Sequence, residues 1–336
     1  MAERYSAANP FRVHVENARS LMPVFIVRPD QYEATLGRHP DVAKVVRTTF
    51  GSDGENFNDS VRDADALVSF RFPRAALREH AKKLKWIQFL AAGIDSFLPL
   101  DWLPAGLQLT TNSGAHVPKA AQSALMAILM VNARIPTLVT MQRERKWNRI
   151  FTPTVEGRTL LIVGVGHVGG AIAQSAKQVG MRVLGIRRSK QSHPAVDEMH
   201  GPDALMALLP RADIVLLSTA LTSKTKALMS EREFSAMKPG AGFINMARGE
   251  LVEQDALSGA LRGGRLACAV IDVASPEPLP PDSSLFDAPN LIITPHVLSD
   301  DIDQYVPRTL DIFFGNIRRH LAGEPLQNLV NLQQEY

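Results

Sequence analysis

The chain has very little cysteine and no long apolar run. Cys268 is the only cysteine among 336 residues, which excludes an internal disulfide framework and a zinc cluster built on cysteines. It lies in the apolar run 266–270, so a buried and unreactive thiol is expected. The most apolar helical stretch, 124–131, is too short to cross a bilayer, and the N-terminus lacks the apolar segment of a secretion signal. These absences predict a soluble cytoplasmic protein.

An excess of charge of one sign is also lacking. The 37 basic and 34 acidic residues leave a formal net charge of +3, and the two signs are interspersed. A solvated surface of mixed charge explains so small an excess, and no nucleic-acid partner is expected. Charged residues make up 21% of the chain and hydrophobic residues 45%, which argues against disorder. A chain of this length favours two domains over one.

The sequence does contain an alternation of short apolar runs with helical stretches. Before residue 111, strands are predicted at 11–15, 66–70, 86–90 and 107–111, and helices at 41–46 and 74–83. A long buried helix at 118–147 is predicted to join the domains. From residue 157 onward, the predicted strands are 159–163, 181–186, 213–217, 242–246, 266–273 and 291–294, and the predicted helices are 168–179, 203–209, 230–237 and 254–262. The pattern predicts an α/β fold of two domains, one with a doubly wound parallel sheet of the Rossmann type and a smaller α/β one.

A glycine-rich turn follows the first strand of the regular region. The residues Gly164-Val165-Gly166-His167-Val168-Gly169 form a G-x-G-x-x-G pattern between a strand and a helix, which is the context that a dinucleotide site requires. Gly164 permits the tight turn, Gly166 lets the backbone approach a pyrophosphate, and Gly169 lets the helix pack closely on the sheet. The N–H groups at the start of the helix would bind the phosphates.

The next strand ends in basic residues, where many dinucleotide sites carry an acidic one. Arg187, Arg188 and Ser189 stand in place of the acid that binds the ribose hydroxyls of NAD. Guanidinium groups bind phosphate in a bidentate manner, and a serine hydroxyl can add a hydrogen bond. NADP(H) is therefore the expected cofactor and NAD(H) the alternative. Exposed loop arginines without a ligand are the simpler explanation that a comparison of cofactors has to exclude.

Three polar residues follow three successive predicted strands of the same region. They are Arg248, Glu277 and His296. Ligands of a parallel sheet bind beyond the carboxyl ends of its strands, so these side chains could converge on one crevice. A histidine oriented by a carboxylate suits proton transfer to a developing alkoxide, and an arginine suits a substrate carboxylate. Each residue alone has a structural explanation, but together they indicate hydride reduction of a ketone, with no metal site.

These residues also carry a family resemblance. The segments INMARGELVEQDAL (244–257), AVIDVASPEPLP (269–280) and LIITPHVLS (291–299) resemble the signatures of the NAD(P)-dependent D-isomer-specific 2-hydroxyacid dehydrogenases. FLAAGIDSF (89–97) resembles their substrate-domain loop, and the segment 112–135 resembles their interdomain helix. The Arg187–Ser189 segment is more similar to the glyoxylate/hydroxypyruvate reductase branch.

The resemblance implies a role for each site residue. Arg248 would bind the 2-oxo-carboxylate, His296 would be the general acid/base, and Glu277 would pair with His296. The backbone N–H groups of a loop in the substrate domain would bind the substrate carboxylate; its residues are Ala92, Gly93 and Ile94. The implied cofactor contacts are Gly164, Gly166, His167, Val168, Gly169, Arg187, Arg188, Ser189, Ala247 and Asp272, of which Asp272 would meet the nicotinamide amide.

The resemblance also implies how the chain is organised. A dinucleotide-binding domain would span 111–296, and a flavodoxin-like substrate domain would combine 1–110 with 297–336. Members of the family are usually dimers built around the interdomain helix. The sequence departs from the family pattern at Gln122, at Leu298 and at the pair Asp300-Asp301, and these departures bear on the shape of the substrate pocket. Phe70 and Arg71 fall where the substrate domain would face the cleft.

The leading prediction is an NADPH-dependent reductase of glyoxylate, hydroxypyruvate or a similar small 2-keto acid. A dinucleotide-sensing corepressor on the same fold is an alternative of another class, against which stand the NADP-type turn and the lack of a disordered tail for recruiting partners. A related formate or phosphite dehydrogenase is a third hypothesis, although a formate enzyme of this family would carry glutamine in place of Glu277. Turnover of glyoxylate with NADPH separates the first two.

Overall fold

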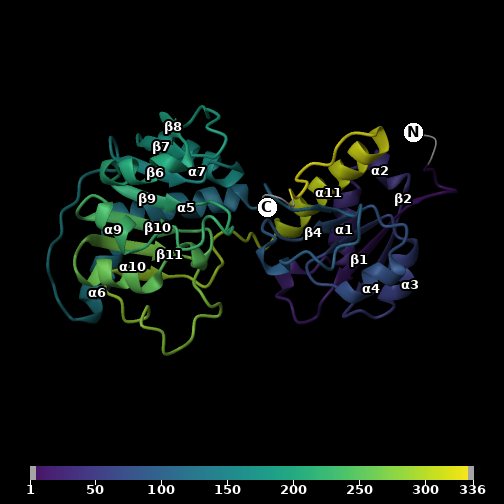
Figure 1. Cartoon of the computed structure of the whole chain (residues 1–336), viewed down its shortest axis with the longest axis horizontal. Coiled ribbons are helices and arrows are strands. Elements are labelled where there is room, and N and C mark those ends of the chain that lie inside the picture. Colours follow the sequence, from purple (N-terminus) through teal and green to yellow (C-terminus); the bar gives the residue numbers. More distant parts are fainter. Residues whose placement is uncertain (1–4, 332–336) are drawn as a thin grey trace. The chain divides into compact units, whose positions relative to one another are not determined.

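The computed structural model describes residues 5–331, and the chain divides into two compact units (Figure 1). The first unit contains the chain up to Ala115 and again from Asp301, whereas the second runs without interruption from His116 to Asp300. The chain therefore crosses between the units twice. These crossings lie a few residues after the predicted boundaries at 110/111 and 296/297. The binding roles assigned to the two domains stay predictions.

The second unit is built on a seven-stranded parallel sheet in the order β12-β11-β10-β9-β6-β7-β8. Its strands are β6 (Thr159–Val163), β7 (Arg182–Ile186), β8 (Glu198–His200), β9 (Ile214–Leu217), β10 (Ala241–Asn245), β11 (Leu266–Ile271) and β12 (Leu291–Ile293). Strand β6 pairs with β7 on one side and β9 on the other, so the winding reverses there. This is the predicted doubly wound Rossmann order, in which ligands bind at the point of reversal.

Two hydrophobic cores cover the two faces of this sheet because its strands are apolar on both sides. Leu160 and Ile162 of β6 pack with α5 and α7, while Leu161 and Val163 belong to the opposite core. The helices of the unit are α5 (Val117–Asn132), α6 (Ile135–Arg143), α7 (His167–Gln178), α8 (Leu205–Leu208), α9 (Glu231–Ala236) and α10 (Gln254–Arg262). Cys268 is buried in one core, which confirms the prediction of a buried thiol, and burial raises its pKa to about 11.

The predicted helix at 118–147 is wrong in one respect, since the segment forms two helices. Arg134, between α5 and α6, has a left-handed backbone (φ 58°), and the chain bends there by 63°. No single helix in the part of the chain that the structure describes is long and apolar enough to cross a membrane. Helices α5 and α6 pass that test only when taken together across their bend, and α5 packs against the sheet.

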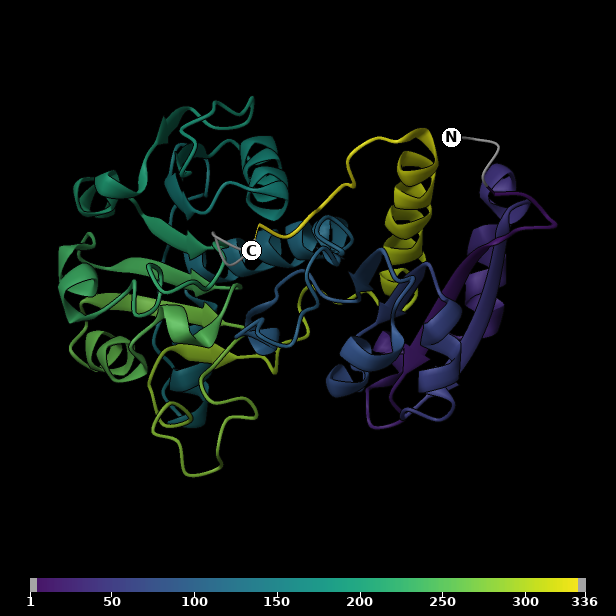
Figure 2. The ribbon, with the colours of Figure 1, turned by 45° about the vertical axis from the view of Figure 1, so that its right-hand side comes forward.

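The first unit has a five-stranded parallel sheet in the order β2-β1-β3-β4-β5, which is the predicted flavodoxin-like order. Its strands are β1 (Phe11–Asn17), β2 (Val46–Ser52), β3 (Ala66–Ser69), β4 (Trp86–Phe89) and β5 (Gln108–Thr110). Its helices are α1 (Pro29–Leu36), α2 (Pro40–Ala43), α3 (Phe57–Asp63), α4 (Arg74–His80) and α11 (Tyr305–Ala322). Helix α11 lies beside this sheet and buries Phe313 and Phe314 against a core that contains Phe11 and Trp86 (Figure 2).

Candidate active site

The glycine turn joins β6 to α7 at the carboxyl edge of the sheet. Gly164 has φ +106°, and a Cβ there would lie 2.6 Å from backbone atoms of Thr219, which follows β9. A Cβ on Gly169 would overlap the Gly164 carbonyl oxygen, so this glycine allows the close approach of α7. A Cβ on Gly166 would meet nothing within 4 Å. This open side and the start of α7 at His167 and Val168 fit a pyrophosphate, whose charge the helix terminus favours.

The basic segment at the end of β7 lies directly beside the glycine turn. The Ile186 carbonyl oxygen accepts hydrogen bonds from the N–H groups of Gly164 (3.0 Å) and Val165 (3.1 Å). Arg187 follows at once, and its carbonyl oxygen accepts the Lys190 N–H at 3.0 Å, so residues 187–190 form a tight turn. Arg187 is half-buried, whereas Arg188 and Ser189 are exposed. The segment therefore fits a phosphate group that lies near the glycine turn.

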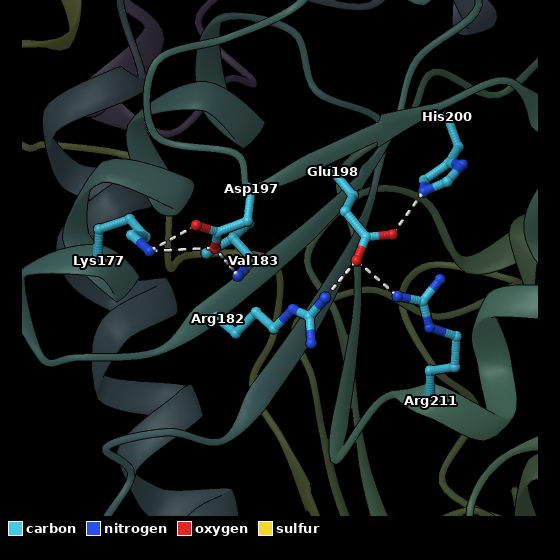
Figure 3. Close-up of polar contacts among 7 residues, drawn as sticks. All are labelled: Lys177, Arg182, Val183, Asp197, Glu198, His200 and Arg211. Carbon is cyan, nitrogen blue, oxygen red and sulfur yellow. Dashed lines mark hydrogen bonds and ion pairs between the residues drawn. The ribbon is translucent and has the colours of Figure 1, made fainter.

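A network of charged side chains holds the far end of the loop that follows β7 (Figure 3). Its side chains are those of Lys177, Arg182, Asp197, Glu198, His200 and Arg211, and Val183 takes part through its backbone N–H. The Asp197 carboxylate accepts hydrogen bonds from the Lys177 ammonium group (2.8 Å) and from the Val183 N–H (2.7 Å). Glu198 accepts hydrogen bonds from Arg211 at 2.6 Å and from Arg182. The network ties the edge strand β8 to β7 and α7.

The turn after β10 carries Arg248 and is shaped by a buried asparagine. The Asn245 amide donates to the Arg248 carbonyl oxygen at 2.9 Å, and its carbonyl oxygen accepts the Ala247 N–H at 3.1 Å. The Arg248 guanidinium is half-buried and donates to the Ala247 carbonyl oxygen at 2.7 Å. Asn245 thus sets the direction in which the chain leaves β10. Sequence reasoning missed this residue, although a polar residue at the end of an apolar strand was a usable signal.

The loops after β10 and β11 lie against one another. A Cβ on Gly249 would overlap the backbone of Ala274, so only glycine permits this approach. The Gln254 side chain donates to the Ser275 carbonyl oxygen at 2.6 Å and accepts the Ser275 N–H at 2.8 Å. These contacts bring the segment that carries Arg248 next to the segment that carries Glu277.

The predicted pair of a histidine and a carboxylate is present. The distance from His296 Nδ1 to Glu277 Oε2 is 2.7 Å, and the other Glu277 oxygen accepts the Ala274 N–H at 3.0 Å. The two side chains are 43% and 39% exposed, so a substrate can reach the imidazole. With Nδ1 bound to the carboxylate, Nε2 is left to exchange a proton. Within residues 5–331, no three His, Cys, Asp or Glu side chains are arranged to hold a metal ion.

Asp272 braces the segment that carries His296. One carboxylate oxygen accepts hydrogen bonds from the Thr294 hydroxyl (2.6 Å) and the Val297 N–H (3.0 Å), and the other accepts the Leu298 N–H (3.0 Å). Burial raises the pKa of Asp272, and these donors oppose the rise. Both oxygens are thus used inside the protein, and the contact with a nicotinamide amide stays a prediction. Sequence reasoning missed this bracing because its backbone donors leave no mark in the residue pattern.

The loop after β4 in the first unit contains the other predicted anion-binding residues. The Ile94 side chain is buried in the core, whereas Ala92 is exposed. No hydrogen bond joins the N–H groups of Ala92, Gly93 or Ile94 to another described residue. These donors are therefore available to a carboxylate.

The residues at which the sequence departs from the family pattern differ in their exposure and in their contacts. Gln122 is exposed on α5, and Leu298 is half-buried. His116 is the first residue of the second unit and Asp300 is its last. The distance from His116 Nδ1 to Asp300 Oδ1 is 3.4 Å. The Phe70 ring packs on Phe25, with 5.2 Å between centroids, which supports a packing role.

The fold and the site define a class of protein, a dinucleotide-dependent oxidoreductase with a Rossmann-type sheet and a histidine–carboxylate pair beyond its strands. Residues 125–297 match the family described as "D-isomer specific 2-hydroxyacid dehydrogenase, NAD binding domain". The chain belongs to the D-isomer-specific 2-hydroxyacid dehydrogenase family.

Three similar proteins illustrate the range of the family. A glyoxylate reductase of Korarchaeum cryptofilum is 33% identical over 81% of this chain and 84% of its own length. A D-3-phosphoglycerate dehydrogenase of Mycobacterium bovis is 30% identical over 93% of this chain and 59% of its own length. The solved structure of a D-isomer specific 2-hydroxyacid dehydrogenase from Xanthobacter autotrophicus Py2, in complex with NADPH and MES, is 28% identical, covers 96% of this chain and 99% of its own, and has a TM-score of 0.82.

Proposed function

We propose that this chain reduces a small 2-keto acid of the glyoxylate or hydroxypyruvate type to the D-2-hydroxy acid, with NADPH as the cofactor. The observation that carries the proposal is the pair of His296 and Glu277, 2.7 Å apart, at the sheet edge that also carries the glycine turn. The glyoxylate reductase of K. cryptofilum supports the substrate class. The NADPH in the X. autotrophicus structure supports the cofactor.

In the proposed mechanism, bound NADPH supplies the hydride, and side chains of the second unit handle charge and proton. The Arg248 guanidinium binds the substrate carboxylate and polarises the neighbouring carbonyl group. His296 donates a proton from Nε2 to the oxygen that becomes the alkoxide. The Glu277 carboxylate orients the imidazole through Nδ1, so that Nε2 faces the substrate. The backbone N–H groups of Ala92, Gly93 and Ile94 are further proposed donors to the substrate carboxylate.

The proposed cofactor preference rests on the turn after β7. Arg187, Arg188 and Ser189 follow the strand at the position from which an acidic residue would repel a 2′-phosphate. Two guanidinium groups and a hydroxyl are donors that suit that phosphate. The glycine turn and the start of α7 would bind the pyrophosphate that NADPH and NADH share. Ala247 and Asp272 complete the proposed set of cofactor residues.

The test is a spectrophotometric panel of 2-keto acids with each reduced cofactor. We expect turnover of glyoxylate or hydroxypyruvate with a higher kcat/KM for NADPH than for NADH. Binding of NADPH without turnover of any 2-keto acid would favour the alternative of a dinucleotide-sensing regulator. A higher kcat/KM for NADH would reject the role proposed for Arg187 and its neighbours.

We also propose that the chain forms a homodimer through the α5 region. Met126 and Leu129 on α5 are 45% and 42% exposed, whereas Ala124, Ala127 and Ile128 of the same helix are buried. Trp147 and Phe151, in the segment after α6, are 94% and 86% exposed. Phe151 also lines a cavity of about 400 Å³ at the amino edge of the sheet, beside Arg158 and Lys238. Large apolar side chains left exposed in one region of a chain favour a protein interface.

A further inference from the structure

The loop between β7 and β8 is fixed at both ends. At its start, the Arg187 N–H donates to the His200 carbonyl oxygen at 2.9 Å. At its end, the Asp197 N–H donates to the Val183 carbonyl oxygen at 2.9 Å, and the Asp197 carboxylate binds Lys177 of α7 (Figure 3). The placement of the residues between these ends depends on further contacts that the loop makes.

His193 supplies such a contact, because its ring rests on the first turn of α7. A Cβ on Gly170 would lie 2.7 Å from His193 Nε2 and between 3.2 and 3.3 Å from the neighbouring ring carbons. A methyl group at position 170 would therefore displace this ring. Gly170 follows the last glycine of the G-x-G-x-x-G pattern, and the dinucleotide pattern does not account for it. The structure explains Gly170 as the residue that leaves room for the His193 ring on α7.

The same ring also shapes the loop itself. His193 Nδ1 accepts the Ala195 N–H at 3.2 Å, as an aspartate or asparagine side chain does in an Asx turn. Pro194 restricts the backbone of His193 to extended conformations. The Val196 N–H donates to the His193 carbonyl oxygen at 3.0 Å, and the Val196 side chain packs against Gly185 of β7. The His193 ring, the turn that follows it and the contact of Val196 with β7 therefore hold the loop together.

We propose that His193, seated on Gly170, is a positioning residue that holds the Arg187–Ser189 segment for the 2′-phosphate of NADPH. This inference rests on the proposed function, since it deepens the proposed preference for NADPH. His193 acts through the loop, whereas the pyrophosphate, which both cofactors share, binds at the glycine turn. Loss of the ring contact should therefore weaken the binding of NADPH and spare NADH.

The experiment measures kcat and KM for NADPH and for NADH with the full chain, using wild type, His193→Ala, Gly170→Ala and the double variant. We expect each single variant to raise the KM for NADPH about five- to tenfold, the effect of losing one contact of hydrogen-bond strength. The kcat and the KM for NADH should stay within about twofold. The double variant should be no worse than His193→Ala, because the added Cβ then has no ring to displace.

Two controls make the outcome decisive. Gln191→Ala changes an exposed side chain of the same loop and should leave the KM for both cofactors unchanged. His193→Asn keeps an acceptor for the Ala195 N–H and should recover part of the NADPH affinity. The inference is overturned if His193→Ala affects both cofactors equally, or if the effects of the two single variants simply add. A wild-type enzyme that prefers NADH would instead overturn the proposed cofactor, which separates the two failures.

Discussion

His296 has a backbone conformation that few residues with a side chain adopt. Its φ is +55°, in the left-handed region, where strain of about 1 kcal/mol or more is typical. Its N–H donates to the Asp272 carbonyl oxygen at 2.7 Å, and the Asp272 carboxylate holds the next two N–H groups. The bracing offsets the strain and fixes the imidazole beside Glu277. Strained residues held in this way cluster at active sites.

Replacement of His296 by alanine tests the proposed proton donor. We expect His296→Ala to lower kcat by a factor of ~10²–10⁴, because the alkoxide loses its positioned acid, while the dissociation constant for NADPH changes little. Stopped-flow single turnovers and fluorescence titration of the cofactor measure the two quantities. The matched control is His80→Ala, since His80 lies on α4 of the first unit, outside the proposed site. Near-normal turnover of His296→Ala would remove this residue from the mechanism.

Replacement of Arg248 tests recognition of the substrate carboxylate. We expect Arg248→Ala to lower kcat/KM for 2-keto acids by about 10- to 100-fold, the typical effect of losing a hydrogen bond to a charged group. Arg248→Lys should recover only part of this, because an ammonium group cannot bind a carboxylate in a bidentate manner. An uncharged ester of the same 2-keto acid, measured in parallel, should lose less than the acid, because the ester loses only the polarisation of its carbonyl group. An equal loss for acid and ester would reject the proposed contact between Arg248 and the substrate carboxylate.

At the scale of elements, the edge strand β8 depends on its ion pairs. The pKa of Glu198 is lowered to about 2, chiefly by its hydrogen bond to Arg211 and then by its contact with His200. Because the folded pKa lies below the ordinary value of 4.5, the pairing stabilises the protein above pH 4.5. That stabilisation is lost as the pH falls from 4.5 towards 2.

We therefore expect Glu198→Gln to flatten the acid dependence of stability. Urea unfolding at pH 7 and pH 3 should show a smaller loss of unfolding free energy for Glu198→Gln than for wild type over this interval. Glu33→Gln, at an exposed position of α1, serves as the control and should follow the wild-type curve. Identical curves for Glu198→Gln and wild type would show that the network does not stabilise β8.

The strands that the sequence predicted are those that contain a run of apolar residues. Strands β6, β7 and β9 to β12 are apolar runs, and the predicted fold class of two parallel α/β sheets is confirmed. Strand β8 was missed because three residues that begin with Glu198 carry no such signal. Strand β2 was missed because it is an edge strand with mostly polar or exposed residues after Val46. The break at Arg134 was missed because a left-handed arginine has no sequence mark.

The candidate site was predictable to the extent that it follows the ends of strands. Arg248, Glu277 and His296 follow β10, β11 and β12, which are neighbours in the sheet, and the pairing of His296 with Glu277 was predicted correctly. The bracing by Asp272 and the seat of His193 on Gly170 were not predictable. Both depend on backbone positions that only the folded chain brings together.

At the scale of the whole molecule, the exposed apolar side chains of the α5 region predict a dimer. We expect the wild type to sediment as a dimer, and Met126→Lys combined with Leu129→Lys to shift it towards the monomer, because charged side chains are disfavoured at the centre of an interface. Met22→Lys, at a 56% exposed position of the first unit, is the control. Analytical ultracentrifugation over a range of concentrations measures the change. A monomeric wild type at micromolar concentration would reject the dimer.

The two crossings of the chain also determine when each unit can be completed during synthesis. All of the sheet in the second unit comes from one uninterrupted stretch, 116–300, so it can close as soon as that stretch has left the ribosome. The first unit starts earlier but needs α11, whose Phe313 and Phe314 fill the core around Phe11. Its nascent strands must therefore remain without that helix while the second unit is made. The unit that begins first is the one that finishes last.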